Sequence, residues 1–307
     1  MKIAIVGSGA MGSLFGGKLS LAGHDVVLYD VYREHVDAVA SGGLFIEDAA
    51  TGDVTMARPR ASAEPREVAQ AEALIIFVKS TATEEAASQF ADIASRTSVG
   101  LTLQNGLGNE EIIRAHFGPE RTAAGVTSQG ATFLGPGRIR HAGKGPTHMS
   151  MSDGRNELLS PLAAALTSAG FETYVEADVA GLIWSKLVIN VGINALTALT
   201  SQTNGRLLDF EETKSLMGEL VNEAVTVARA RGISLTYADP LAAVLDVARK
   251  TGSNRSSMLQ DFDRKRQSEI AFINGAIVRE AAKLGIPAPV NATLTLLIRA
   301  LEKVRQS

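Results

Sequence analysis

Short apolar runs alternate with stretches of helical periodicity through the first half of the chain. Lys2–Val6, Val26–Tyr29, Ala73–Val78 and Val99–Leu103 are apolar segments, several rich in β-branched residues, and are typical of buried strands. Between them, apolar residues recur every three to four positions, as on the buried face of a helix. This alternation predicts an α/β domain.

The chain between residues 120 and 175 has a different pattern. Thr122–Thr127, Ala131–Leu134, Arg138–His141 and Thr147–Ser150 are short segments separated by Gly and Pro. They predict an antiparallel edge on the sheet. Helices are expected over 83–96 and 156–169, and a last strand over 172–175.

Strand signals end near Asp178, and helical periodicity continues to the C-terminus. Helices are predicted over 178–200, 209–231, 238–250, 266–284 and 290–305, with glycines at the breaks. The predicted organisation is an α/β domain over 1–175 followed by an all-helical domain over 176–307.

The stretch GSGAMG links the first strand to the first helix. It fits the pattern G-x-G-x-x-G in the strand–turn–helix context that dinucleotide binding requires. The three glycines permit a tight turn, approach of a pyrophosphate to the backbone and close packing of the helix. The first domain is therefore expected to be of the Rossmann type, with candidate cofactor-binding residues Gly7, Gly9, Ala10, Met11 and Gly12.

Asp30 ends the second predicted strand, where an acidic residue would bind the ribose hydroxyls of NADH and disfavour NADPH. Arg33 follows closely and could instead accept a 2′-phosphate. An aspartate at this position is also a common helix N-cap. The sequence thus predicts NADH as cofactor and leaves NADPH open.

Lys79 and Asn105 follow two further predicted strands. Because ligands in open α/β sheets lie beyond the carboxyl ends of the strands, both residues are expected near the cofactor. Simple solvation of the lysine and a turn role for an asparagine before glycine are the alternatives.

Gly181–Thr200 is apolar enough for a buried helix, yet it carries Lys186, Asn190 and Asn194. At a spacing of four residues these side chains lie along one helix face. Buried polar groups must be hydrogen-bonded or face a cavity, because unpaired burial is costly. A structural polar network, a lysine that reaches the surface and a functional site all remain open.

Two later segments carry further candidate chemistry. Ser257 lies in SSMLQD, which has the form of a helix start with a serine as cap or ligand. Glu269 heads an apolar helical stretch, where it could serve the helix dipole or act as counter-charge to a buried lysine.

Composition narrows the functional classes. A net charge of −3 gives no case for nucleic acid or an anionic membrane as partner, and the absence of cysteine removes thiolate chemistry and disulfides. The five histidines have no metal-ligand spacing.

The N-terminal apolar run is too short for a signal peptide, and the polar stripe within Gly181–Thr200 argues against a membrane span, so a cytoplasmic protein is expected. The apolar C-terminal helices could support a homodimer.

Taken together, the motifs resemble those of the ketopantoate reductase (2-dehydropantoate 2-reductase) family over the whole chain. The resemblance rests on GSGAMG, FVKS, LQNGLG and HAGKGPTH in the first half and on WSKLVIN, TNGRL, SSMLQD and SEIAFING in the second. It implies a Rossmann domain and a helical domain with substrate between them, and reduction of a 2-keto acid by NADH or NADPH in pantothenate synthesis. The familiar members carry an arginine near the end of the second strand and use NADPH, whereas this chain has Asp30.

The resemblance also implies residue roles. The general acid falls on Lys186, and Glu269 falls where it can orient the lysine and contact substrate and cofactor. Asn105 falls beside both nicotinamide and substrate. The remaining substrate-binding residues fall on Asn190, Asn194 and Ser257. An ammonium at Lys186 would stabilise the charge that grows on the carbonyl oxygen and supply a proton.

Two other classes of function remain as alternatives. Related dehydrogenases of hydroxy acids share the glycine pattern and an interdomain lysine, but their Ser-Gly-Gly segment is not found around 126–130. A dinucleotide-binding sensor without turnover would have no reason to combine Lys186 with Glu269 and Ser257. A panel of 2-keto acids would separate these functions.

Overall fold

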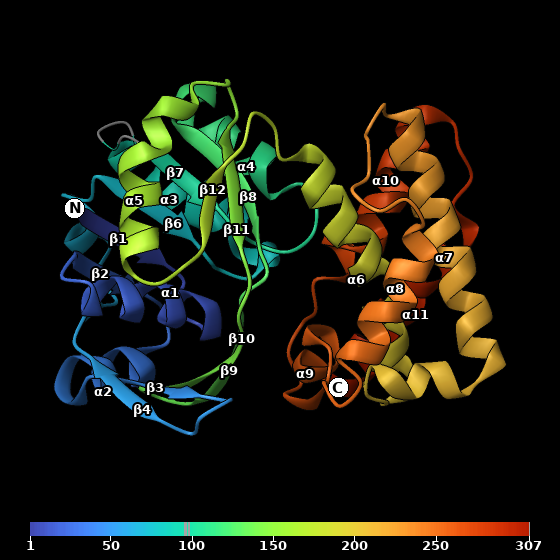
Figure 1. Ribbon diagram of the computed structural model, residues 1–307, viewed down its shortest axis with the longest axis horizontal. Helices are drawn as coiled ribbons and strands as arrows, with labels where there is room; N and C mark the ends of the chain where they lie inside the picture. Colours follow the sequence, from blue (N-terminus) through green and yellow to red (C-terminus); the bar gives the residue numbers. More distant parts are fainter. Residues whose placement is uncertain (95–96, 98, 307) are drawn as a thin grey trace. The chain divides into compact units, whose positions relative to one another are not determined.

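The computed structural model describes residues 1–94, 97 and 99–306, and these form two compact units (Figure 1). One unit comprises Met1–Gln104 and Asn109–Val179. The other comprises the chain from Ala180 onward together with the short loop Asn105–Gly108. A loop between a strand and a helix of the first unit thus packs as part of the second.

The first unit is built on an eight-stranded sheet in the order β12-β11-β8-β7-β6-β1-β2-β5. The strands from β8 to β5 are parallel, β11 runs antiparallel to β8, and β12 is parallel to β11. The parallel part has the strand order of the Rossmann fold. The strands are β1 (Lys2–Val6), β2 (Asp25–Tyr29), β5 (Arg60–Ser62), β6 (Ala73–Ile76), β7 (Val99–Thr102), β8 (Thr122–Thr127), β11 (Thr147–Met151) and β12 (Thr173–Val175).

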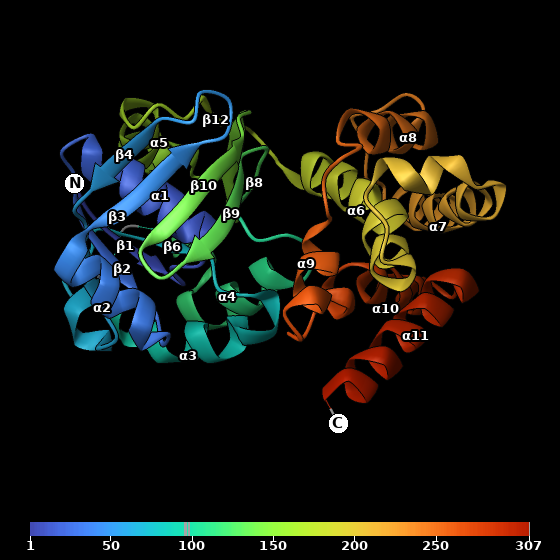
Figure 2. The same ribbon diagram turned by 90° about the horizontal axis from the view of Figure 1, so that it is seen from below.

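Helix α1 (Ala10–Leu21) lies between this sheet and a second, four-stranded sheet (Figure 2). The second sheet has the order β4-β3-β10-β9, with β3 (Leu44–Asp48), β4 (Val54–Ala57), β9 (Gly130–Gly135) and β10 (Arg138–Gly143). A side chain at Gly17 of α1 would come within 2.8 Å of Ile46 and Leu44. The second sheet therefore packs directly on the helix.

The predicted antiparallel edge is correct only for β11. Strand β8 is parallel to β7, and β9 and β10 belong to the second sheet. Every residue of β8 is buried, as expected for a strand inside a parallel sheet covered on both faces. Because its residues are small or polar (TAAGVT), the pattern of apolar residues does not predict that β8 is a buried strand of the parallel sheet.

The remaining helices of the first unit cover both faces of the main sheet. Alternate residues of β1 face opposite ways: Ile3 and Ile5 pack with α1 and α5 (Ser160–Ser168), and Ala4 and Val6 pack with α3 (Thr83–Ala94) and α4 (Asn109–Phe117). Helix α2 (Arg33–Gly42) packs near β5. The helix predicted over 83–96 is present as far as Ala94, and its last two residues lie outside the described residues.

The second unit is a helical bundle around α6 (Ala180–Thr200). Helix α6 packs with α7, α8, α9 and α11, and a side chain at Gly192 would meet Val244 of α8 at 2.7 Å. The other helices are α7 (Glu211–Ala230), α8 (Pro240–Lys250), α9 (Ser257–Asp263), α10 (Asn274–Leu284) and α11 (Pro289–Gln306). Helix α6 is long and apolar enough to cross a membrane, but 67% of its apolar window is buried in the protein, as in a core helix. The predicted α/β class, with a Rossmann unit followed by a helical unit, is confirmed.

The single helix predicted over 266–284 is wrong. The chain instead forms a 3-10 turn, η6 (Ile270–Phe272), and α10 begins only at Asn274. The backbone N–H of Ser268 donates to the Glu302 carboxylate at 2.8 Å, and the Ser268 hydroxyl accepts from Ile270 N–H. These side-chain hydrogen bonds take the place of helical ones and leave Glu269 at the head of the short turn.

Candidate active site

The glycine-rich loop has the geometry that its sequence predicts. Gly7 has a φ of +94° and its N–H donates to Tyr29 O, and a side chain there would come within 2.5 Å of Val78 N. A side chain at Gly12 would overlap the carbonyl of Gly7. At Gly9, by contrast, an added Cβ would have no atom within 4 Å. The first and third glycines are required by the fold itself, and the second leaves open space at the start of the helix.

That open space fits an anionic group. Gly9 is the N-cap of α1, no side chain caps the helix, and its first turn holds no acidic residue. The first N–H groups of a helix have no partner within it and attract anions. Ala10 and Met11 would therefore present their N–H groups to a pyrophosphate. The residues present fit a dinucleotide.

Asp30 is fixed beside this loop. One carboxylate oxygen accepts from Ser8 N–H at 2.6 Å, and the other accepts from Tyr32 N–H at 3.0 Å. Arg33, the alternative partner for a 2′-phosphate, lies 3.8 Å from the carboxylate of Glu64, with both side chains exposed. The carboxylate of Asp30 is thus held at the strand end by backbone donors.

A buried histidine is linked to the glycine-rich loop by hydrogen bonds. The neutral ring of His35 accepts from Gly137 N–H at Nδ1, so Nε2 carries the proton and donates to the Ser13 hydroxyl at 3.0 Å. Ser13 in turn donates to Ser8 O. Burial lowers the pKa of His35 and so favours the neutral ring, and the charge of Asp30 opposes this shift. No sequence motif predicts these hydrogen bonds, because a histidine within a helix gives no signal of its own.

Lys79 and Asn105, both expected near the cofactor, fall in different units. Lys79 follows β6 in the first unit and is exposed. Asn105 begins the loop that packs with the helical unit, where Leu107 N–H donates to Phe272 O at 2.8 Å. A side chain at Gly106 would come within 2.5 Å of that same oxygen. Asn105 therefore belongs to a loop that packs on η6, the turn that follows Glu269.

The polar stripe of α6 marks the accessible face of an otherwise buried helix. From Trp184 to Ala198, every residue is buried except Lys186 and Asn190. Burial lowers the pKa of Lys186 to about 8, and the charge of Glu269 partly opposes that shift. Glu269 is itself only 7% exposed. The two groups therefore form an ammonium–carboxylate site within the helical unit.

Asn190 supplies an unused hydrogen-bond donor one turn along α6. Its amide nitrogen is buried and has no partner among the described residues. An unpaired buried donor is costly and is expected where a ligand completes the bonding. Asn194, a further turn along, is 5% exposed. Lys186 and Asn190 thus present two donors side by side.

The two serines at the start of α9 have separate roles. Ser256 is the N-cap, its hydroxyl accepts from Leu259 N–H and pairs with Thr197 of α6 at 2.6 Å. Ser257 is the next residue and is partly exposed. The guanidinium of Arg255, which could have met a substrate carboxylate, is bound by both oxygens of Asp263. The sequence alone could not show which serine caps the helix.

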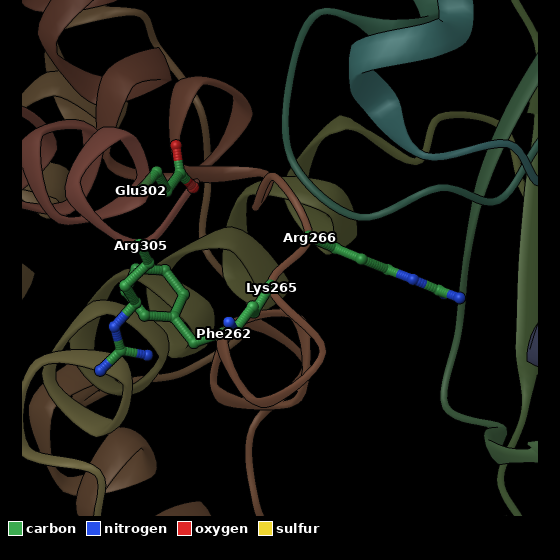
Figure 3. Close-up of a pocket in the computed structure, with 5 residues that line it drawn as sticks. All are labelled: Phe262, Lys265, Arg266, Glu302 and Arg305. Carbon is green, nitrogen blue, oxygen red and sulfur yellow. The ribbon is translucent and has the colours of Figure 1, made fainter. Parts of the chain in front are cut away.

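A small cavity of about 10 Å³ lies elsewhere in the helical unit, lined by Phe262, Lys265, Arg266, Glu302 and Arg305 (Figure 3). The Arg305 guanidinium lies 4.8 Å from the centre of the Phe262 ring. Such a cavity has room for about one water molecule. It contains none of the predicted site residues. Across residues 1–94, 97 and 99–306, no group of three or more His, Cys, Asp and Glu could hold a metal ion.

The first unit has a glycine-rich loop with open space at the start of α1, and the helical unit has a lysine–carboxylate pair. Together they define the class of dinucleotide-dependent oxidoreductases. Within that class, residues 3–154 match the family model for ketopantoate reductase PanE/ApbA, and residues 178–302 match the model for its C-terminal domain. The chain belongs to the ketopantoate reductase family, as the motifs predicted.

Full-length relatives agree with this assignment. The chain is 35% identical over 304 residues to a 2-dehydropantoate 2-reductase of Halobacterium salinarum, covering 99% of each. It is also 35% identical to that of Pyrococcus horikoshii, covering 99% of the chain and 98% of the relative. Among solved structures, a PanE/ApbA family ketopantoate reductase from Ralstonia eutropha has a TM-score of 0.91 at 35% identity, with 100% of both chains covered.

A second structural relative has a different substrate. D-mandelate dehydrogenase in complex with NADH and anilino(oxo)acetate also has a TM-score of 0.91, at 28% identity and with 100% of both chains covered. The fold of this chain is therefore shared by reductases of the family and by a dehydrogenase of an aromatic 2-hydroxy acid.

Proposed function

We propose that the protein reduces 2-dehydropantoate to pantoate with a reduced nicotinamide cofactor. The observation that carries this proposal is the accessible stripe of α6, where a lysine of lowered pKa lies one turn from an unsatisfied amide donor. The family membership supports the same substrate.

The residues of the chain have distinct parts in this reaction. When bound, the reduced nicotinamide supplies the hydride that reaches the keto carbon. Negative charge then grows on the carbonyl oxygen, where the Lys186 ammonium stabilises it and delivers a proton. Glu269 orients the ammonium. Its charge raises the pKa of Lys186, so the lysine keeps its proton up to a higher pH. Asn190, Asn194, Ser257 and Asn105 would hold the polar groups of the keto acid.

The first unit would hold the dinucleotide. Gly7, Gly9 and Gly12 shape the loop, and the N–H groups at the start of α1 meet the pyrophosphate. Lys79, exposed after β6, would contact the cofactor as a cation. Glu269 would also touch the cofactor, as the family resemblance implies.

We further propose that NADH is preferred to NADPH. The Asp30 carboxylate is held in place by two backbone N–H groups, and it would accept from ribose hydroxyls but repel a 2′-phosphate. Asp30→Ala should therefore bring the specificity constants (kcat/KM) for the two cofactors together. A wild-type preference for NADPH would refute this part of the proposal.

A second candidate is the reduction of an aromatic 2-keto acid with NADH. Its support is the full-length similarity to D-mandelate dehydrogenase, whose complex contains NADH. The same helix stripe would serve, because the chemistry at the keto group is unchanged.

The decisive assay follows the loss of reduced nicotinamide absorbance with a panel of 2-keto acids. The panel includes 2-dehydropantoate and phenylglyoxylate, each with NADH and with NADPH. We expect 2-dehydropantoate with NADH to have the largest kcat/KM. A larger value for phenylglyoxylate would favour the second candidate, and no turnover with any keto acid would refute both.

We place this activity in the cytoplasm and propose a homodimer, with no nucleic acid or membrane as partner. Leu296, Leu297 and Val304 of α11 are apolar side chains that remain exposed, which supports association of two copies. Sedimentation equilibrium of the purified protein tests the dimer.

A further inference from the structure

Five polar side chains form a connected network at the carboxyl ends of β6 and β7. The side-chain amide of Gln104 donates to Val78 O at 2.7 Å and to the Thr83 hydroxyl at 2.8 Å, and its oxygen accepts from the Thr102 hydroxyl at 2.9 Å. The Thr83 hydroxyl donates to Asn109 Oδ1 at 2.8 Å. The amide of Asn109 donates to the Ser80 hydroxyl at 3.1 Å. We call these five residues, Ser80, Thr83, Thr102, Gln104 and Asn109, the strand-end network.

The network lies next to Lys79, which the proposed function assigns to the cofactor, and next to Asn105, which the family resemblance places beside both nicotinamide and substrate. Val78 and Ser80, on either side of Lys79, are held by Gln104 and Asn109 respectively. Gln104 and Asn109 are also the residues on either side of the loop that begins with Asn105. The backbone segments that carry Lys79 and Asn105 are therefore tied to each other through side chains.

Thr83 is the central member of the strand-end network. Its hydroxyl accepts from Gln104 and donates to Asn109, so it joins the two halves. Thr83 is fully buried, and Ser80, Thr102 and Asn109 are at most 4% exposed. Buried networks of this kind are rigid when every member is paired, and they lose more than one bond when a central member is removed.

We propose that Thr83, with Gln104 and Asn109, is a positioning residue for the cofactor: it fixes Lys79 and Asn105 before the dinucleotide binds. This rests on the proposed function of those two residues. A preformed site binds more tightly because fewer side chains are ordered on binding. Thr83 itself touches neither cofactor nor substrate in this account.

The test uses an isosteric pair of variants and a matched control. Thr83→Val removes the hydroxyl at constant shape, and Thr83→Ser keeps it. Thr122→Val is the control, because Thr122 is also fully buried and its hydroxyl donates to Gly118 O at the amino end of β8. The dissociation constants of NADH and NADPH are measured by isothermal titration calorimetry, and thermal unfolding is followed in parallel.

Loss of one or two buried hydrogen bonds predicts a roughly tenfold weaker binding of the preferred dinucleotide by Thr83→Val. Thr83→Ser should stay within about twofold of wild type, and Thr122→Val should lower the unfolding temperature without changing cofactor affinity. Wild-type affinity in Thr83→Val, or equal losses in Thr83→Ser or Thr122→Val, would overturn the proposal. Turnover of 2-keto acids is not needed for this measurement, so failure of the proposed reaction and failure of the network are distinguished.

Discussion

Lys186 is the residue on which the chemistry depends, and its environment sets the pH at which it can act. The pKa of Lys186 is lowered to about 8, because burial outweighs the opposing charge of Glu269. As a general acid in the direction of reduction, Lys186 must be protonated. The value of kcat/KM should therefore be constant below about pH 8 and fall as the pH rises through the lysine's pKa.

Glu269→Gln tests this electrostatic coupling. The substitution removes the carboxylate charge and keeps the shape, so the pKa of Lys186 should drop further and the break in the pH profile should move to lower pH. The readout is the position of the break, because the absolute rate also reflects substrate contacts of Glu269. An unchanged break would show that Glu269 does not act on Lys186.

Asn190 offers a test at the same scale that separates binding from stability. Its buried amide nitrogen has no partner among the described residues, so Asn190→Leu should leave the free energy of unfolding unchanged or increase it. The KM for the 2-keto acid should rise roughly tenfold, the value of one hydrogen bond to a charged or polar ligand group.

The control for this substitution is another buried asparagine of the helical unit. Asn291 donates to Glu223 and accepts from Asn274, and all of these bonds lie within the protein. Asn291→Leu should therefore destabilise the protein by roughly 2–3 kcal/mol, because it leaves buried groups unpaired. Denaturant unfolding compares the two variants, and equal destabilisation would contradict the assignment of Asn190 to a ligand.

At the scale of elements, the turn between β1 and α1 separates glycines needed for folding from one needed for binding. Gly9→Ala adds a methyl group into open space, so the unliganded protein should unfold at the wild-type temperature. Because the same space would receive the pyrophosphate, affinity for the cofactor should fall about tenfold or more.

Gly7→Ala should behave differently. The positive φ and the approach of Val78 N to 2.5 Å predict a loss of stability of roughly 1–3 kcal/mol or more, before any cofactor is added. Thermal unfolding and calorimetric titration of both variants make the comparison. A destabilised Gly9→Ala with normal cofactor affinity would reverse the roles given to the two glycines.

Elements with a strong local pattern could be predicted from the sequence, and those set by distant contacts could not. The glycine-rich loop and α6 depend on residues within a few positions of each other. The interruption of the helix predicted over 266–284 depends on Glu302, a residue of a different helix. The place of β8 in the parallel sheet could not be predicted, because its burial comes from neighbours on both sides. The site residues on α6 could be predicted because their spacing of four is close to the helix period of about 3.6 residues.

At the scale of the whole molecule, the loop Asn105–Gly108 shows the limit of local patterns most clearly. Its sequence, between a strand and a helix of the first unit, gives no sign that it packs on Phe272 of the second. That packing brings Asn105 into the same unit as Lys186 and Glu269. The residues assigned to the 2-keto acid therefore all belong to the helical unit, and the Rossmann unit carries the glycine loop and Asp30.

The central claim is that the Lys186 ammonium supplies the proton when a 2-keto acid is reduced. The most direct test compares kcat/KM of wild type and Lys186→Ala with 2-dehydropantoate and the preferred cofactor, together with the cofactor dissociation constant. We predict a loss of activity of about 10²–10⁴-fold, as for removal of a general acid, with cofactor affinity unchanged. Activity within a few-fold of wild type in Lys186→Ala would contradict the account.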